Sequence, residues 1–422
     1  MTIDTAQLAD FPSVSEDNGP LPAPLPELHP GLDGVYLNAS RVSRVDGEAG
    51  ELTLGGFELE ELAPRASFEE VAWMLLAGEL PTIAELGRLR AFLARHRTLP
   101  PFALSALSEA AERRSAPMAA LRLAVASFEL GSKAEAEAGA PPVPEIWEGD
   151  GAAFYEALSI LARVPTAVAT YERLAAGLEP GAPSLDPESS LSAAFLEQLH
   201  GRGARTGEAR ALDTYLATVA DHGCNASTFT ARVVISTGAG LVPSVLGALG
   251  ALSGPLHGGA PGPALDLVLE IGTPERAEEV IRARLAAGER LMGFGHRVYK
   301  VRDPRAAVLA GAVEALFAES ESKDGKAELY ALFRHVEATA TRLLDEHKPG
   351  RRLRANVELY TALLLDGLGL RSEAFSCIFA MGRTAGWLAH AREQQLTGRL
   401  IRPRLRYEGE RGRRYTPPAD LG

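Results

Sequence analysis

The stretch "SFEEVAWMLLAG" (Ser67–Gly78) carries the local signals that set the fold class expected for this chain. Ser67 is followed three residues later by Glu70, which is the capping-box pattern of a helix start. An apolar run comes next, and Gly78 suits the left-handed position at which helices commonly end. The stretch therefore predicts a capped, largely buried helix.

The same signals recur on both sides of this stretch. Thr82 and Glu85 repeat the capping box before a run with apolar residues at helical spacing, and "LPP" (Leu99–Pro101) ends that run. β-Branched and aromatic residues are sparse beside Ala, Leu, Glu and Arg. We therefore expect a mainly α protein. The exception is "SRVSRVDGEAGELTLGGFEL", which alternates around Asp46-Gly47 and predicts a small N-terminal β-hairpin.

Composition narrows the class of protein. The chain has 422 residues, 46% of them hydrophobic and 23% charged, which is typical of a folded soluble protein with room for more than one domain. Its net charge of −12 is a poor overall match for nucleic acid. The Arg-rich segment 399–414 could in principle bind DNA or RNA, but it offers no interleaved aromatic platform and is better interpreted as a tail reaching over a partner subunit. Two cysteines without a CxxC motif argue against a disulfide framework or a zinc site.

Two segments bear on location. The N-terminus "MTIDTAQLADF" has no positively charged region before an apolar run, so we expect a cytoplasmic protein whose residues 1–30 form a Pro-rich tail. The uncharged stretch Val233–Leu256 is long enough to span a bilayer. It contains five Gly and two Pro, however, and a buried helix or helix pair is the better interpretation. We expect no membrane partner.

Four segments place polar residues in Gly-rich or apolar surroundings. In "ADHGCNASTFTAR", His222 and Asn225 are three residues apart and would share one face of a helix. The alternative is a helix cap beside a satisfied core histidine. In "SGPLHGGAPGPAL", His257 precedes two glycines, which allow close approach of a ligand or simply form a turn.

The third segment, "GFGHRVYKVRDPR", is punctuated by glycine and rich in cations: His296, Arg297, Lys300 and Arg305. Backbone N–H groups and positive side chains in such a loop suit an anionic or phosphate-bearing ligand. The pattern is neither the GxGxxG of a dinucleotide fold nor a kinase catalytic loop.

The fourth constellation joins "RANVELYTALL" and "FAMGRTAGWLAH". Glu358 opens an uncharged run, and is either a solvated first-turn carboxylate or a base at the edge of a pocket. Arg383 is a charge within an apolar stretch, where it needs a substrate carboxylate or a structural acid as its partner. Histidines, a carboxylate and arginines together are the groups needed to remove a proton beside a carbonyl and stabilise the resulting enolate.

These segments resemble the citrate synthase family. "SFEEVAWMLLAGELPT", "NASTFTAR", "SGPLHGGAP", "GFGHRVYKVRDPR", "NVELY" and "GRTAGWLAHAREQ" occur in the family's order, and the likeness runs from about Gly31 to Tyr415. The resemblance implies a helical homodimer with two domains per chain. Residues 31–256 and 365–422 would form the large domain, and residues 257–364 the small domain with the CoA-binding and catalytic segments.

The resemblance also implies roles for individual residues. The catalytic set would be His257, which donates to the thioester oxygen, His296, which protonates the oxaloacetate carbonyl, and Glu358, the base. Oxaloacetate would be bound by His222, Asn225, Arg305 and Arg383, with Arg402 donated by the other subunit. Lys300 and Arg297 would lie near the CoA phosphates. Acetyl-CoA is then a substrate, and neither a metal nor a permanently bound cofactor is implied.

One departure from the family pattern concerns the base. The usual residue is an Asp in "NVDFY", whereas this chain has Glu358 in "NVELY", as does a second bacterial branch of the family. The longer side chain reaches about 1.5 Å further. Two alternatives to citrate synthase stay open: a 2-methylcitrate synthase that uses propionyl-CoA, and a non-catalytic paralogue that binds a dicarboxylate or CoA.

Overall fold

The computed structural model describes residues 27–130, 138–257, 261–295, 299, 301–318, 326–350 and 353–415. The chain divides into two units. Ser40–Ile401 form one unit, and Met1–Ala39 together with Arg402–Gly422 form the other. The elements and contacts below belong to the Ser40–Ile401 unit unless stated otherwise.

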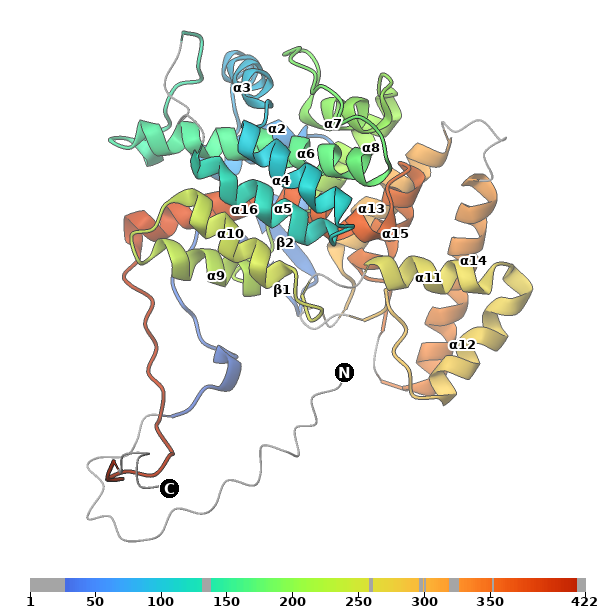
Figure 1. The fold of residues 1–422 in the computed structure, drawn as a ribbon. Helices are drawn as coiled ribbons and strands as arrows, with labels where there is room; N and C mark the ends of the chain where they lie inside the picture. The colour runs from blue at the N-terminus through green and yellow to red at the C-terminus, as the bar shows by residue number, and fades with distance from the viewer. Residues whose placement is uncertain are drawn as a thin grey trace, which may run out of the picture. The chain divides into compact units, whose positions relative to one another are not determined.

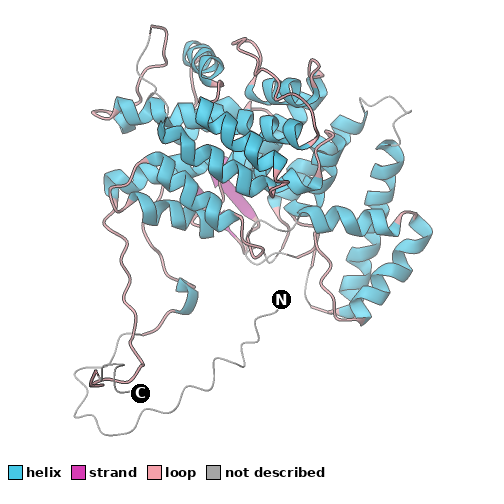
Figure 2. Cartoon of the chain, viewed as in Figure 1, coloured by secondary structure: helices cyan, strands magenta, loops and turns pink. Residues whose placement is uncertain are grey.

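Helices make up nearly all the regular structure (Figure 2), which confirms the predicted mainly α fold. The α-helices are α1 (Leu59–Leu62), α2 (Phe68–Ala77), α3 (Ile83–His96), α4 (Pro101–Glu112), α5 (Pro117–Ala126), α6 (Gly151–Ala175), α7 (Leu191–His200), α8 (Thr206–Val219), α9 (Ala226–Ile235), α10 (Leu241–Leu252), α11 (Pro261–Ile271), α12 (Ala277–Ala286), α13 (Pro304–Ala318), α14 (Lys326–His347), α15 (Val357–Gly367) and α16 (Phe375–Thr397). Short 3-10 turns cover Pro30–Leu32 (in the other unit), Ser127–Leu130, Glu145–Trp147, Pro274–Arg276 and Ser372–Ala374.

The predicted capping boxes are both present. The Ser67 side chain accepts from the backbone N–H of Glu70, whose carboxylate accepts from the Ser67 N–H, and Gly78 ends α2 at φ +90°. Thr82 and Glu85 form the same reciprocal pair at the start of α3. Each such cap stabilises its helix by about 1 kcal/mol.

The N-terminal hairpin is also confirmed. β1 (Ser43–Asp46) pairs antiparallel with β2 (Glu51–Leu54), with Ser43 opposite Leu54 and Asp46 opposite Glu51. A short third strand, β3 (Phe57–Glu58), pairs antiparallel with β2 and was not predicted. The hairpin matters for the site because Ser43 contacts the loop that carries His222.

The two longest described helices of the core are α6 and α16. α16 packs against α2, α5, α6, α8, α9 and α10, so it is the central element of this region (Figure 1). α6 is long and apolar enough to cross a membrane by length and composition, but 78% of its most apolar window is buried inside the protein. Such burial is typical of a core helix.

The uncharged stretch 233–256 forms the end of α9 and the whole of α10, which pack against one another as a helix pair. A Cβ added to Gly247 of α10 would lie 3.0 Å from a methyl of Val234 and 3.3 Å from Thr230. The small residue therefore permits the close approach of the two helices. This outcome confirms the prediction of a buried helix pair.

A second group of helices lies apart from this core. α12 packs on α14, and α11 packs on α15. Figure 1 shows α11, α12 and α14 together on one side of the unit, with α13 and α15 between them and α8. α13 contacts both α8 and α15. The helices that start at Pro304 and Val357 therefore connect this group to the core.

Candidate active site

The His222 loop joins α8 to α9. Asn225 caps α9, because its Oδ1 accepts from the backbone N–H groups of Ser227 and Thr228 at 3.2 Å each. His222 lies before the cap and outside any helix, so the two residues do not share a helix face and the alternative of a helix cap holds for Asn225. Gly223, at φ +61°, breaks the helical path between the two residues. The Nε2 atom of His222 lies 3.0 Å from the hydroxyl of Tyr299.

His257 is anchored by the first turn of α9. Its Nε2 atom accepts from the Ser227 N–H at 3.3 Å and lies 2.8 Å from the Ser227 hydroxyl. A backbone N–H can only donate, so Nε2 is an acceptor and the ring proton sits on Nδ1. Burial, with a further contribution from the charge of Arg383, lowers the pKa of His257 to about 4. His257 is therefore a neutral imidazole whose Nδ1–H can donate to a ligand.

Glu358 lies in the first turn of α15, capped by Asn356, whose Oδ1 accepts from the Glu358 N–H at 3.1 Å. The Oε2 atom of Glu358 is buried and has no hydrogen-bond partner among the described residues. Burial raises the pKa of this carboxyl, against the opposing charge of Arg305. A buried carboxylate oxygen without a donor is a stronger base than a solvated one, so the interpretation as a solvated first-turn residue fails.

The backbone just before His296 is laid against the start of α15. Gly295 N–H donates to Arg354 O at 2.8 Å, and the Asn356 side chain donates to Gly295 O at 2.7 Å. Gly293 has φ +86°, and a Cβ there would lie 2.9 Å from Leu359, so only glycine fits. His296, Arg297 and Lys300 themselves lie outside the described residues, as do Gly258 and Gly259.

Arg305 is buried at the start of α13 and forms a two-pronged ion pair with Asp303. Its Nε and Nη2 atoms lie 3.0 and 2.9 Å from the two carboxylate oxygens. Asp303 also accepts from the Val357 N–H at 3.2 Å, which joins the start of α13 to the start of α15. Burial lowers the pKa of Arg305, but Asp303 outweighs that effect and the net pKa is raised. The sequence analysis missed Asp303, although an acid directly before Pro304 and a predicted cation was a usable signal.

Arg383, on α16, has 1% of its surface exposed. Its Nε donates to Val219 O at 2.6 Å, and its guanidinium lies 4.5 Å from the centre of the Phe379 ring. No carboxylate among the described residues forms an ion pair with it. Burial lowers its pKa to about 10, a shift that Asp221 opposes and Arg305 increases. A buried cation with unfilled donors fits an anionic ligand.

The described candidates share one region. The charge of Arg383 lowers the pKa of His257. The charge of Arg305 lowers the pKa of both Arg383 and Glu358. The pKa of the buried Tyr215 hydroxyl is raised by its burial and responds to Arg383, Glu358 and Arg305 together. Such electrostatic effects fall off with distance, so Arg383, Glu358 and Arg305 all lie near Tyr215.

Arg402 belongs to the other unit and is exposed there, so its predicted role in the site stays a prediction.

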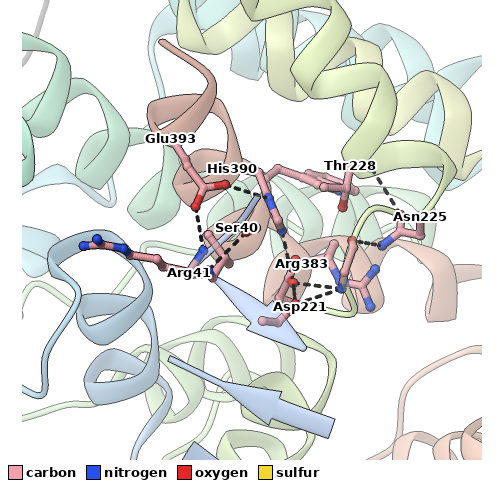
Figure 3. Close-up of polar contacts among 12 residues, drawn as sticks. Ser40, Arg41, Asp221, Asn225, Thr228, Arg383, His390 and Glu393 are labelled. Carbon is pink, nitrogen blue, oxygen red and sulfur yellow. Dashed lines mark hydrogen bonds and ion pairs between the residues drawn. The ribbon is translucent and has the colours of Figure 1, made fainter. Parts of the chain in front are cut away.

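Among the described residues, no three His, Cys, Asp or Glu side chains gather in a way that could hold a metal ion. The sequence analysis also missed Asp221 and His390, which form a buried pair beside Arg383 (Figure 3).

Comparison with known proteins places this arrangement in one family. The family model "Citrate synthase, C-terminal domain" matches residues 31–404. The citrate synthase of Acidithiobacillus ferridurans is 36% identical over 93% of this chain and 98% of its own. The 2-methylcitrate synthase of Mycobacterium tuberculosis is 34% identical over 92% of each chain.

A solved structure agrees with the sequence matches. The citrate synthase of Thermoplasma acidophilum, in a ternary complex with carboxymethyl coenzyme A and oxaloacetate, superposes with a TM-score of 0.81. The two chains are 30% identical, and the match covers 93% of this chain and 99% of that one. With the family model spanning most of the sequence and relatives aligned almost end to end, this chain belongs to the citrate synthase family.

Proposed function

We propose that the protein condenses acetyl-CoA with oxaloacetate and water to give citrate and CoA. The observations that carry the proposal are the neutral Nδ1–H donor of His257, whose pKa the charge of Arg383 lowers, and the Glu358 oxygen without a hydrogen-bond partner among the described residues. Arg383, which forms no ion pair among the described residues, supplies the anion site. A donor, a base and an anion site are the minimum for forming an enol from a thioester and adding it to a keto acid.

Oxaloacetate, in this proposal, is held first. Arg383 pairs with one carboxylate, which supplies the anion that its buried guanidinium lacks. His222 and Asn225 lie on the neighbouring loop, and Arg305 adds positive charge although its Nε and Nη2 are already bonded to Asp303. Arg402 from a second copy of the chain completes the set, which makes a homodimer part of the proposal.

The chemical steps follow from the state of each group. Glu358 takes a proton from the acetyl methyl group while His257 donates its Nδ1 proton toward the thioester oxygen, which forms the enol. The enol carbon attacks the ketone carbon of oxaloacetate, the thioester carbonyl forms again as the enol proton returns to His257, and His296 supplies the proton to the new hydroxyl. Water then cleaves the thioester of citryl-CoA and releases citrate and CoA. Lys300 and Arg297 bind the CoA phosphates, and neither a resident cofactor nor a metal has a role.

Two domains of unequal size would enclose this chemistry. We assign residues 31–256 and 365–422 to the large domain and residues 257–364 to the small domain, with residues 1–30 outside both. The packing of α12 on α14 and of α11 on α15 supports this division. Glu358 and Arg305 would then lie on one domain and Arg383 on the other, so domain closure would complete the site and expel water. We place the enzyme in the cytoplasm, in the tricarboxylic acid cycle.

Turnover of the purified protein tests the proposal directly. Release of CoA should require both oxaloacetate and acetyl-CoA. Glu358→Gln keeps the shape of the side chain but removes its basicity, and should lower kcat by roughly two to four orders of magnitude. Near-normal kcat in this variant would refute the assigned base. Tight oxaloacetate binding without turnover by the wild type would favour the non-catalytic paralogue instead.

A second candidate reaction uses propionyl-CoA, and the similarity to a 2-methylcitrate synthase favours it. A pocket distinguishes one methylene by only about 1–3 kcal/mol, roughly 10- to 200-fold in kcat/KM. Measuring kcat/KM for acetyl-CoA and propionyl-CoA on one enzyme preparation separates the two. We expect acetyl-CoA to have the higher value, and the reverse order would make 2-methylcitrate the product.

A further inference from the structure

A buried network of polar side chains lies beside Arg383 (Figure 3). His390 of α16 lies between Asp221 and Arg232, with its Nε2 3.2 Å from Asp221 Oδ2 and its Nδ1 2.7 Å from Arg232 Nη2. Arg232 also forms an ion pair with Glu393. The Arg41 N–H donates to the other Glu393 oxygen at 2.7 Å. No step of the mechanism above uses these residues.

The protonation state of His390 follows from its neighbours. Arginine only donates, and two of its nitrogens approach His390 Nδ1 at 3.1 and 2.7 Å, so Nδ1 accepts. The ring proton therefore sits on Nε2 and is donated to Asp221. Burial raises the pKa of Asp221, but His390, Arg383 and Ser43 together outweigh it and leave the pKa below its usual value. The pair is thus a neutral imidazole that donates to an ionised, fully buried carboxylate.

Asp221 in turn fixes the loop that carries His222. Its Oδ2 accepts from the Gly223 N–H at 3.0 Å and from the Ser43 hydroxyl at 2.5 Å. Ser43 also accepts from the Gly223 N–H at 2.9 Å, so strand β1 holds the same peptide group. The other oxygen, Oδ1, is buried and has no hydrogen-bond partner among the described residues. The Asp221 carboxylate therefore places negative charge near Arg383, although its Oδ1 forms no hydrogen bond with the described residues.

We propose that Asp221 and His390 are positioning residues for the oxaloacetate site: Asp221 fixes the His222 loop and supplies the negative charge that faces Arg383, and His390 holds Asp221 in place. The inference rests on the proposed function, because it assigns these residues to the site where oxaloacetate binds. Neither residue needs to touch the substrate. Their effect is to keep one donor loop and one guanidinium in place before the ligand arrives.

The electrostatic surroundings give this proposal a distinctive readout. The groups acting on Arg383 are Asp221 after α8, Tyr215 on α8 and Arg305 on α13. Asp221 and Tyr215 raise the pKa of Arg383, whereas burial and Arg305 lower it to about 10. Removing the Asp221 charge lowers that pKa further, toward the range in which enzymes are assayed. If Asp221 supported the fold without acting on Arg383, its removal would leave the titration of Arg383 unchanged.

The first experiment compares Asp221→Asn with Glu172→Gln. Glu172 is also a buried carboxylate with one bonded and one unbonded oxygen, but it pairs with Arg371 and lies on α6. Asp221→Asn should raise KM for oxaloacetate by roughly 10- to 100-fold. The high-pH limb of its kcat/KM profile should move to lower pH. Glu172→Gln should change neither quantity. Equal effects of the two variants on both quantities would overturn the proposal.

The second experiment tests His390 and holds even if Asp221→Asn does not fold. His390→Gln keeps an N–H donor near the position of Nε2, whereas His390→Leu fills the space without one. We expect His390→Gln to keep the oxaloacetate KM within about fivefold of wild type and His390→Leu to raise it at least about tenfold. Identical KM values for the two variants would overturn the role of His390. Failure of the proposed function is separable, because it shows as absent turnover in the wild type.

Discussion

At the scale of single residues, the site is recognised by a buried charged side chain that forms no ion pair among the described residues. Arg305 is fully paired with Asp303, whereas Arg383 is equally buried and has no ion pair among the described residues. An isolated buried cation is unfavourable unless something else compensates it, so Arg383 is the stronger candidate for a substrate carboxylate. The same argument applies to the unbonded oxygen of Glu358.

Replacing Arg383 tests this argument. Arg383→Ala should mainly weaken oxaloacetate binding, because a bond between charged groups contributes about 1.5–3 kcal/mol, or roughly 10- to 150-fold in KM. KM for acetyl-CoA, measured at saturating oxaloacetate, should change much less. The matched variant is Arg305→Ala, which leaves Asp303 as an unpaired buried charge and should lower the unfolding temperature as well. An unchanged oxaloacetate KM in Arg383→Ala would count against the clamp.

At the scale of elements, two glycines in "GRTAG" bring α16 against the end of α8. A Cβ on Gly382 would lie 2.7 Å from Val219 and 2.8 Å from the Leu216 carbonyl oxygen. One on Gly386 would lie 2.3 Å from the Ala220 carbonyl oxygen. This close approach lets Arg383 reach the Val219 carbonyl and His390 reach Asp221. The motif is therefore a packing device as well as the carrier of a functional arginine.

Gly386→Ala should consequently destabilise the protein. Its methyl group would meet backbone rather than a flexible side chain, and overpacking of this kind costs about 1–3 kcal/mol. The control is Gly87→Ala in the middle of α3, where nothing lies within 4 Å of the added Cβ. That change should stabilise its helix by up to about 1 kcal/mol. Urea unfolding midpoints should therefore move in opposite directions, and parallel shifts would contradict the close-packing argument.

At the scale of the whole molecule, a pair of buried acids ties three core helices together. Asp213 of α8 accepts from the Ser192 hydroxyl of α7 at 2.7 Å. Glu69 of α2 accepts from the Leu191 N–H at 2.7 Å. Burial, together with the nearby charge of Glu69, raises the pKa of Asp213 from 3.8 to about 7. Asp213 therefore keeps its proton in the folded state at pH values where the unfolded chain has lost it.

This pair predicts that stability falls as pH rises. Between about pH 4 and pH 7 the folded state binds more protons than the unfolded state, so the free energy of unfolding decreases by at most about 1.4 kcal/mol per pH unit from this group. Asp213→Asn is neutral throughout and removes this contribution. Melting temperatures at pH 5 and pH 8 should therefore differ more for the wild type than for the variant. An equal difference in both proteins would show that Asp213 does not titrate in this range.

Local signals in the sequence determined the helix starts at Ser67 and Thr82, the hairpin around Asp46, and the helix pair of 233–256. Each depends on residues a few positions apart, so one stretch contains the whole interaction. The sequence motifs also correctly indicated the citrate synthase family. Local spacing failed at His222, where a positive-φ glycine interrupts the helix.

Only the tertiary structure decided which charges are paired. It showed that Arg305 forms an ion pair with Asp303 while Arg383 forms none among the described residues, and it showed which nitrogen of His257 carries the proton. It also revealed the contact between His390 and Asp221, which are 169 positions apart in the chain. The physical reason is that the state of a buried charge depends on every group packed around it, and packing joins segments whose separation in the sequence leaves no local pattern.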